Sequence, residues 1–449
     1  MRNEGPVTDN GEGTMVMIRC PSIKGPVKVI QIDTLAVGGG AARAAYRLTV
    51  ALRRLGVDST KLVESHDIYR PEVELFDKPM DLSSRVIRVL RREYLRLGIA
   101  RYRETELLGN EFFTEDRSKY GASLVSRLRD CDVINLHWIG GFVDIPSFFT
   151  KVPQRTPVVW TLHDMNPFTG GCHYDHGCGR FIGSCGACPQ LGSNQKRDFS
   201  RQIWQRKKNA FDKVEPEWLQ LVAASSWISD VVKTSSLMGR FPVTVIPHGL
   251  DLEVFAPRNR SFARTILGIP QEAKVVLFSA HALETRRKGF PVLVEALAEL
   301  KKIPSLLLVS LGHGASEIPG HLEYMRLGHV DNERLLSLVY SAADIFVAPS
   351  LQEMFGLTVL EAMACGTPAV GSDVGGIREI IRHDVSGLLV PPGDPKLLGS
   401  AISELLNDPA RLTTMSEDCR RIAIEEYDIE LQARRYLELY EKVLAHHHH

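Results

Sequence analysis

The sequence has neither a surplus of charge of one sign nor a long apolar run. Lys plus Arg and Asp plus Glu each total 54, so the formal net charge is zero. A nucleic-acid-binding domain usually shows a basic excess, and we therefore expect no nucleic-acid partner. No apolar run approaches the roughly 18–20 residues that a membrane-spanning helix needs. Because a basic-then-apolar secretory pattern is missing as well, we expect a cytoplasmic protein.

Cysteine is scarce, with eight residues in a chain of 449, which excludes a disulfide scaffold. Four of the eight are nevertheless crowded into a Cys-x5-Cys-x6-Cys-x2-Cys segment. Four thiols at this density could close a tetrahedral zinc site, and disulfides are rare in a reducing cytoplasm. The spacing differs from the usual pair of Cys-x2-Cys motifs, so unpaired thiols and disulfides remain as alternatives. A structural zinc ion would be bound by Cys172, Cys178, Cys185 and Cys188.

Apolar strands alternate with helical patterns in two series along the chain. The first series opens with a strand at 27–33, a turn at Gly38-Gly39-Gly40 and a helix that ends at Gly56. Its later strands are expected at 132–138, 157–162 and 219–223. A second series of strands is expected at 274–280, 305–311, 344–348, 368–370 and 387–390. This alternation is typical of parallel sheets that helices cover on both faces.

We therefore predict an α/β protein with two facing Rossmann-like αβα domains. The expected divisions are a disordered tail (1–26), an N-terminal domain (27–246), a Pro- and Gly-bearing linker (247–259), a C-terminal domain (260–425) and a last helix (426–445). Residues 446–449 are interpreted as the remnant of a purification tag. Ligands of such proteins bind in the cleft where the carboxyl ends of the strands converge.

The strongest local motif is PSLQEMFGLTVLEAMACGTP at 349–368. It directly follows a predicted strand, so Glu353, Phe355 and Gly356 should lie in the loop at that strand's carboxyl end. A helix should then begin near Leu357 and carry Glu361. Free backbone N–H groups at a helix start suit a phosphate or a sugar hydroxyl. We interpret the two carboxylates as acceptors that hold different hydroxyls of one elongated ligand.

This Glu-x7-Glu pattern resembles that of the retaining glycosyltransferases of family 4. The resemblance extends to the segments 38–48, 161–174, 246–251, 287–290 and 342–353. The likeness spans nearly the whole chain after the tail, and it is greatest to bacterial members that build exopolysaccharide, capsule or O-antigen chains. It implies the GT-B fold, with an inter-domain cleft. It also implies transfer of a sugar from a UDP- or GDP-sugar to a glycan or lipid-linked glycan, with no metal required for transfer.

The resemblance assigns roles to the motif residues. Glu361 would bind the ribose hydroxyls of the donor, and Glu353 would hold the transferred sugar with help from the backbone N–H groups of Phe355, Gly356 and Leu357. Arg287 and Lys288 would neutralise the departing diphosphate, since a preorganised cation stabilises developing negative charge. Many family members carry a further diphosphate arginine before this pair. This sequence has Ala280-His281 there, so either Arg286, Arg287 and Lys288 suffice or His281 contributes.

Further contacts are implied in both domains. Gly38, Gly39 and Gly40 would let the backbone approach the diphosphate and the acceptor. Val330 would offer its backbone to the nucleotide base, although a plain turn is an equal alternative. His163 follows a predicted strand directly and would contact the donor sugar or the acceptor. A buried core histidine is the alternative interpretation of His163.

Two other functions are compatible with parts of the sequence. The missing arginine would suit a module that binds a sugar nucleotide without turnover. The set His163, Asp164, His173 and His176 would suit a metal-dependent hydrolase.

Residues 83–103 carry seven arginines and one acid, with Val86, Leu90, Tyr94 and Leu97 at helical spacing. This segment is either a basic amphipathic helix on the anionic inner face of the cytoplasmic membrane, or an arginine-rich surface above a core-facing stripe.

Overall fold

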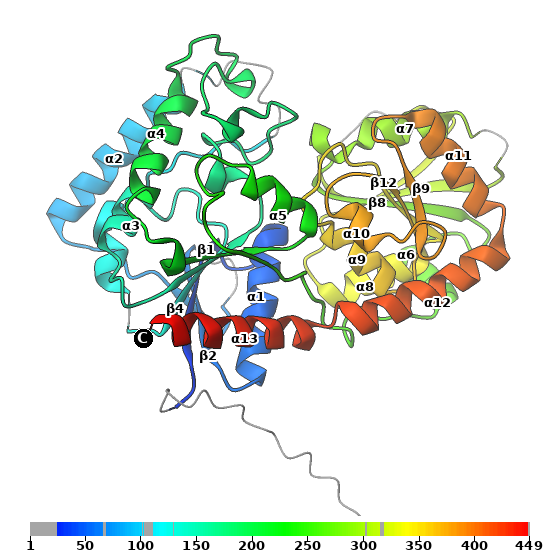
Figure 1. The fold of residues 1–449 in the computed structure, drawn as a ribbon. Helices are drawn as coiled ribbons and strands as arrows, with labels where there is room; N and C mark the ends of the chain where they lie inside the picture. The colour runs from blue at the N-terminus through cyan, green and yellow to red at the C-terminus, as the bar shows by residue number, and fades with distance from the viewer. Residues whose placement is uncertain are drawn as a thin grey trace, which may run out of the picture.

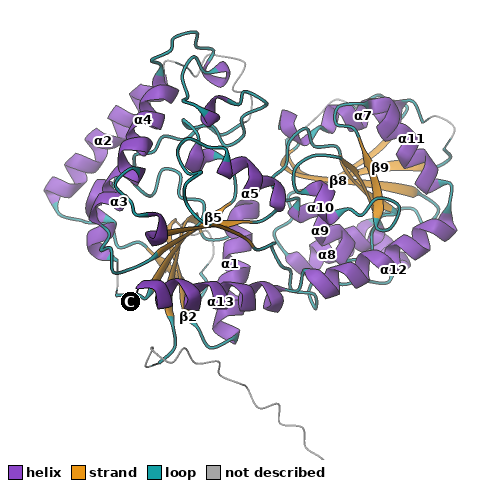
Figure 2. Ribbon diagram, in the orientation of Figure 1, coloured by secondary structure: helices purple, strands orange, loops and turns teal. Residues whose placement is uncertain are grey.

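The computed structural model describes residues 25–65, 69–100, 102, 111–128, 130–300, 303–314 and 318–447. The predicted tail therefore lies almost wholly outside the described residues. Within them, two wholly parallel sheets form the centres of two αβα domains, which lie side by side (Figure 1). Helices surround the strands of both domains (Figure 2). The predicted α/β class with two Rossmann-like domains is confirmed.

The N-terminal sheet has the strand order β3-β2-β1-β4-β5-β6-β7. Its central strands are buried along their whole length, as their continuous apolar runs predict. The strands are β1 (Lys28–Leu35), β2 (Asp58–Ser65), β3 (Val73–Leu75), β4 (Val133–Leu136), β5 (Val158–Leu162), β6 (Leu219–Ala223) and β7 (Val243–Val245). Its helices are α1 (Gly39–Arg54), α2 (Leu82–Ala100), α3 (Ile145–Lys151), α4 (Phe199–Phe211) and α5 (Ser226–Lys233).

Strand β2 was not predicted, because polar residues break its apolar pattern. Lys61 in the middle of β2 is fully buried. Its Nζ donates to the carbonyl oxygens of Ala36 and Ala42 at 2.7 and 2.8 Å and lies 3.1 Å from Asp33 Oδ2. A buried cation persists only with such partners. Lys61 therefore joins β2 to the loop after β1 and to the start of α1.

The C-terminal sheet has the order β10-β9-β8-β11-β12-β13. The half-exposed strand β10 at its edge was also not predicted. The strands are β8 (Lys274–Ala282), β9 (Leu306–His313), β10 (Glu323–Gly328), β11 (Ile345–Ala348), β12 (Ala369–Ser372) and β13 (Gly387–Val390). The helices are α6 (Arg260–Leu267), α7 (Phe290–Ala298), α8 (Glu333–Ala342), α9 (Leu357–Ala364), α10 (Ile377–Ile380), α11 (Pro395–Leu406) and α12 (Pro409–Glu426).

The last helix, α13 (Ile429–His447), returns to the N-terminal domain and lies beside α1 (Figure 1). Its buried tyrosines bond to the N-terminal sheet. Tyr436 Oη lies 2.9 Å from Thr161 Oγ1, and Tyr440 Oη accepts from Asn135 at 3.0 Å and from Gln31 at 3.3 Å. The segment predicted as a separate helix is thus part of the layer that covers the N-terminal sheet.

Helix α2 corrects one of the two interpretations of the arginine-rich segment. None of its residues is buried, and Leu90 and Tyr94 are 65% and 63% exposed. The predicted stripe therefore does not face the core. Arg91 Nη2 lies 2.7 Å from Oδ2 of Asp144, the buried residue that caps α3 in the same domain. Among the described residues, no helix combines the length and apolar character needed to span a bilayer.

Candidate active site

Two adjoining pockets lie at the carboxyl ends of the C-terminal strands. The first is lined by Lys288, Glu353 and Gly356, among others. The second lies between the domains, and it adjoins the first because both are lined by Ser279 and Thr358. Predicted binding residues from both domains line the second pocket: Gly39, Gly40, Val330, Leu357 and Glu361.

Glu353 is a buried carboxylate held by two cations. Lys288 Nζ donates to its Oε2, and Arg287 Nη1 lies 3.4 Å from the same oxygen. Although burial opposes the charge, Lys288 and Arg287 lower the pKa of Glu353 below its usual value. The site therefore holds an ionised carboxylate and a lysine side by side at the wall of one pocket.

Two glycines let the loops of this site approach each other backbone to backbone. Gly289 has φ of +73°, and a Cβ there would lie 1.9 Å from the carbonyl oxygen of Pro349. A Cβ on Gly375 would lie 1.7 Å from the carbonyl oxygen of Glu353. Only glycine fits such positions. The turn that carries Lys288 is thereby pressed against the loop that carries Glu353.

Arg287 is engaged mainly with protein groups rather than with the two pockets. Its guanidinium lies 3.7 Å from the ring centroid of Tyr174, and its Nε lies 3.3 Å from Glu111 Oε1. Tyr174 and Glu111 belong to the N-terminal domain, and Glu353 to the C-terminal domain. Arg287 thus joins the domains beside Glu353, whereas the resemblance placed it on the diphosphate. It lines neither of the two pockets described above.

Glu361, on α9, is bonded at both carboxylate oxygens. Arg47 Nη2 donates to Oε1 at 2.8 Å, and the Tyr340 hydroxyl donates to Oε2 at 2.9 Å. The same Arg47 nitrogen lies 2.8 Å from Glu333 Oε1, while its Nη1 is buried and has no hydrogen-bond partner among the described residues. Arg47 comes from α1, so this ion pair crosses between the domains. Sequence reasoning missed Arg47, although a charge on an otherwise alanine-rich face of α1 was a usable signal.

His163 follows β5, as predicted, and belongs to a cluster of histidines. Its Nε2 lies 3.0 Å from His137 Nδ1, and His137 Nε2 lies 2.7 Å from Gln31 Oε1. Because Gln31 Oε1 is an acceptor, His137 donates to it from Nε2. If His137 is neutral, its Nδ1 then accepts from His163 Nε2, which leaves His163 Nδ1 as an acceptor.

Burial keeps these histidines neutral. It lowers the pKa of His248 to about 4, with the nearby Arg47 charge as a second cause. The pKa values of His137 and His163 also fall well below their usual value, with burial as the main cause. The His163 ring stacks on His248 with centroids 5.2 Å apart, and His248 in turn packs against Phe355. His163 is thus connected to the site through His248, but it lines neither pocket.

A second histidine cluster borders the pocket between the domains. This cluster consists of His281, His313 and His329, whose potential metal-binding atoms all lie within 4.8 Å of one another. In the described part of the chain, no other group of three His, Cys, Asp or Glu residues meets this distance. His329 Nε2 lies 2.8 Å from Asp331, which also pairs with Arg43 at 3.0 Å. His281 stands where many family members have the diphosphate arginine, and it lines the pocket between the domains.

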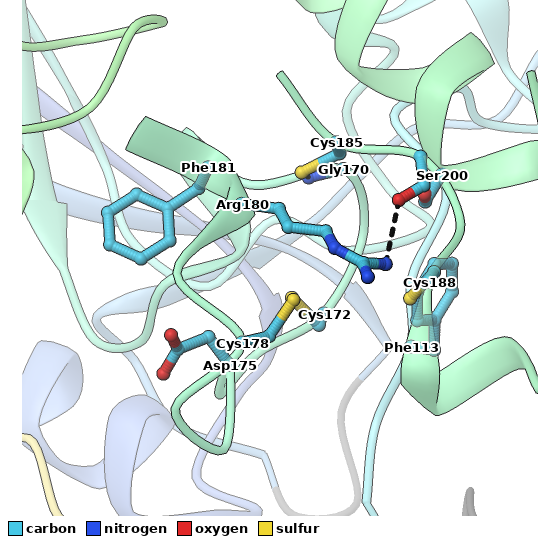
Figure 3. A pocket seen from close by; sticks show the side chains of 11 residues that line it. Phe113, Gly170, Cys172, Asp175, Cys178, Arg180, Phe181, Cys185, Cys188 and Ser200 are labelled. Atoms are coloured by element: carbon cyan, nitrogen blue, oxygen red, sulfur yellow. Dashed lines mark hydrogen bonds between the residues drawn. The ribbon is translucent and has the colours of Figure 1, made fainter. Parts of the chain in front are cut away.

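The residues of the hydrolase alternative do not form one site. His173 Nδ1 is bonded to Asp164 Oδ2 inside the domain, and its Nε2 lies 2.7 Å from Thr114 Oγ1. His176 is exposed. These residues contribute no trio of close ligand atoms in the ranges that the structure describes. The four clustered cysteines, by contrast, line a single pocket, which lies in the N-terminal domain (Figure 3).

Residues 273–408 match the family model "Glycosyl transferases group 1". The D-inositol 3-phosphate glycosyltransferase of Thermobispora bispora is 36% identical over 219 residues, which covers 45% of this chain and 51% of the relative. This chain therefore spans about half the length of that curated relative. Several similar relatives bear the same name, whereas the sequence led us to expect polysaccharide enzymes.

Solved structures resemble the whole fold. Sucrose-phosphate synthase of Thermosynechococcus elongatus has a TM-score of 0.64 and 20% identity, with 93% of this chain and 99% of that chain covered. HepE of Anabaena, in complex with UDP-glucose, has a TM-score of 0.62 and 17% identity, with 92% and 99% covered. Residues 273–408 are thus similar to the group 1 glycosyl transferase model, and the two-domain fold is shared with solved structures such as a glycosyltransferase from Rickettsia africae.

Proposed function

We propose that this chain is a retaining glycosyltransferase that moves a sugar from a nucleotide-diphosphate sugar to a glycan or lipid-linked glycan. One observation carries the proposal: Lys288 and Glu353 line one pocket, and Glu361 lines the adjoining pocket together with Gly39 and Gly40 of the N-terminal domain. A cation, a sugar-binding carboxylate and a second carboxylate are the groups that such a donor needs. Similarity to the group 1 family model supports the reaction class.

The proposed mechanism uses side chains that the site already holds. Glu361 binds the donor ribose, and Glu353 holds the transferred sugar. Lys288 stabilises the negative charge that appears on the diphosphate when the sugar–phosphate bond breaks. The acceptor hydroxyl attacks on the face that the diphosphate leaves, and a diphosphate oxygen takes its proton. No separate protein base is then required, and transfer needs no metal.

The donor and the acceptor can be proposed as classes. HepE was solved with UDP-glucose, which supports a UDP-sugar donor here as well. For the acceptor we propose a glycan of a bacterial surface polysaccharide. The names of the curated relatives favour a second candidate, an inositol phosphate.

A donor panel and an acceptor panel test the function. Thermal stabilisation by UDP-, GDP- and ADP-sugars should identify the donor, since stabilisation grows with the ratio of ligand concentration to Kd. Release of the nucleoside diphosphate should then depend on one acceptor class. Donor binding without any release would favour the alternative of a non-catalytic sugar-nucleotide-binding module. Full dependence on a metal would contradict the mechanism.

We also propose that α2 contacts an anionic membrane. Apolar side chains at helical spacing are half or more exposed on it, and the exposed arginines lie on the same helix. A surface of this kind suits the interface of an anionic bilayer. Binding to vesicles with anionic lipid should weaken with salt and with the double variant Leu90→Ser/Leu97→Ser. A lack of binding at low salt would refute this contact.

A further inference from the structure

The long loop between β5 and α4 has almost no regular secondary structure, although Phe168, Phe181 and Leu191 are buried in hydrophobic clusters. The helical pieces within residues 163–198 are short 3-10 turns: η4 (Asn166–Phe168), η5 (Arg180–Ile182) and η6 (Pro189–Leu191). An irregular loop of this length is uncommon in a compact domain. The loop contains Cys172, Cys178, Cys185 and Cys188, all unpaired in the structure.

These four side chains surround one small cavity of about 20 Å³ (Figure 3). The backbone turns beside them are unusual. Ala187, between Cys185 and Cys188, has φ of +48°, and the preceding Gly186 has φ of +139°. A non-glycine residue in the left-handed region is uncommon and marks a constrained turn. This turn aims the thiols of a Cys-x2-Cys pair at the same cavity.

A hydrogen-bond donor and two cations lie beside the cysteines. The backbone N–H of Gly170 donates to Cys185 Sγ at 3.1 Å, which stabilises negative charge on that sulfur. Arg180 lines the cavity, and its Nη1 donates to the Gly186 carbonyl oxygen at 3.0 Å (Figure 3). Lys207 is fully buried, bonds to the carbonyl oxygens of Asn166 and Thr169, and interacts electrostatically with Cys172 and Cys185.

We propose that Cys172, Cys178, Cys185 and Cys188 bind one structural zinc ion. On binding Zn²⁺, the four thiols would release their four protons to the solvent, which gives a site of net charge −2 that Lys207 and Arg180 partly balance. In the structure, no three of these four sulfur atoms lie within 4.8 Å of one another. Each sulfur moves about a single rotatable bond, so side-chain rotations toward the shared cavity can bring the four to tetrahedral coordination.

Such an ion would fix a loop that contacts the C-terminal domain close to Glu353. Tyr174 and Asp175 lie between the first two cysteines of the loop. Tyr174 packs on Arg287, and Asp175 Oδ1 accepts from Gln352 Nε2 at 2.9 Å. The zinc-bound loop would therefore hold the N-terminal domain against the C-terminal loop that carries Glu353. The zinc proposal stands on the cysteine cavity alone and does not depend on the proposed reaction.

Elemental analysis and thiol counting test the site directly. Protein that is purified without chelator and without residues 446–449 should contain one zinc ion per chain. Under denaturing conditions with a chelator, all eight cysteines should react with a thiol reagent. The absence of zinc together with eight reactive thiols would overturn the proposal in favour of unpaired thiols. The absence of zinc together with fewer reactive thiols would overturn it in favour of disulfides.

Variants locate the ion. Cys178→Ser and Cys188→Ser should each abolish stoichiometric zinc and lower the thermal midpoint. Cys131→Ser, which lies outside the cluster, should retain one zinc ion, and so should His281→Ala, which disrupts the histidine trio. If a cysteine variant fails to fold, a mercurial that modifies thiols in the intact protein should still release one zinc ion. Zinc that persists in both cluster variants, or that is lost in His281→Ala, would refute this location.

Discussion

Replacement of Lys288 tests the assignment of the leaving-group cation most sharply. The variant Lys288→Met keeps a long side chain and removes the ammonium that pairs with Glu353 in the first pocket. A charge-assisted hydrogen bond contributes roughly 1.5–3 kcal/mol. Since each 1.36 kcal/mol corresponds to a factor of ten in rate, kcat should fall roughly 10- to 150-fold. The donor KM should change little, because the charge on the diphosphate develops in the transition state.

Stability should fall as well, but by less than the full cost of breaking a buried ion pair. Removal of one partner from such a pair costs about 3–5 kcal/mol when the remaining charge is left alone. Here Arg287 stays 3.4 Å from Glu353 Oε2 and retains part of the compensation. The expected loss is therefore below that range, and urea unfolding measures it independently of the kinetics.

The assay is nucleoside diphosphate release with the identified donor and acceptor. The matched control is Arg286→Met, since Arg286 is exposed and stands in the same 3-10 turn, η8 (Arg286–Lys288), without lining either pocket. Arg286→Met should keep the parent kcat and KM. A parent-like kcat in Lys288→Met, or equal losses in both variants, would refute the role of Lys288.

Three further outcomes follow from buried groups. Glu361→Gln should raise the donor KM and reduce thermal stabilisation by the donor, because the uncharged amide binds the ribose hydroxyls more weakly. Glu404→Gln, an exposed position on α11, is the control, and unchanged donor binding in Glu361→Gln would exclude ribose contact. The free energy of unfolding should decrease as the pH falls from about 6.5 toward 4. The reason is that His137, His163 and His248 take up protons in the unfolded chain but not in the folded chain. Each of these histidines should contribute up to about 1.4 kcal/mol per pH unit. His248→Asn should make this slope shallower by one proton, and a pH-independent stability over this interval would contradict the burial argument. Tyr436→Phe should cost about 1 kcal/mol in urea unfolding, through loss of the buried bond to Thr161. A loss near zero would indicate that α13 is docked by apolar packing alone.

Local sequence patterns predicted much of the fold. Buried parallel strands such as β6 and β13 appear as short continuous apolar runs, and their predicted bounds agree with the structure. Strand β2 was not predicted because Lys61 interrupts its apolar pattern. The carbonyl oxygens of Ala36 and Ala42, together with the carboxylate of Asp33, stabilise that lysine inside the domain. Local patterns also did not show that α13 packs on the N-terminal domain, since its tyrosines bond to strands that are far away in the chain.

The sequence alone determined the alternation of strands and helices, the loop position of Glu353 and the helical position of Glu361, because these depend on neighbouring residues and on periodicity. Only the tertiary structure decided that Arg47 pairs with Glu361 across the domains. It also decided that Arg287 lies against Tyr174 instead of lining either pocket, and that the apolar stripe of α2 is exposed. These contacts join segments hundreds of residues apart or depend on what a helix packs against. Which partner a charged side chain meets is decided by how the two domains pack, and no local pattern encodes that.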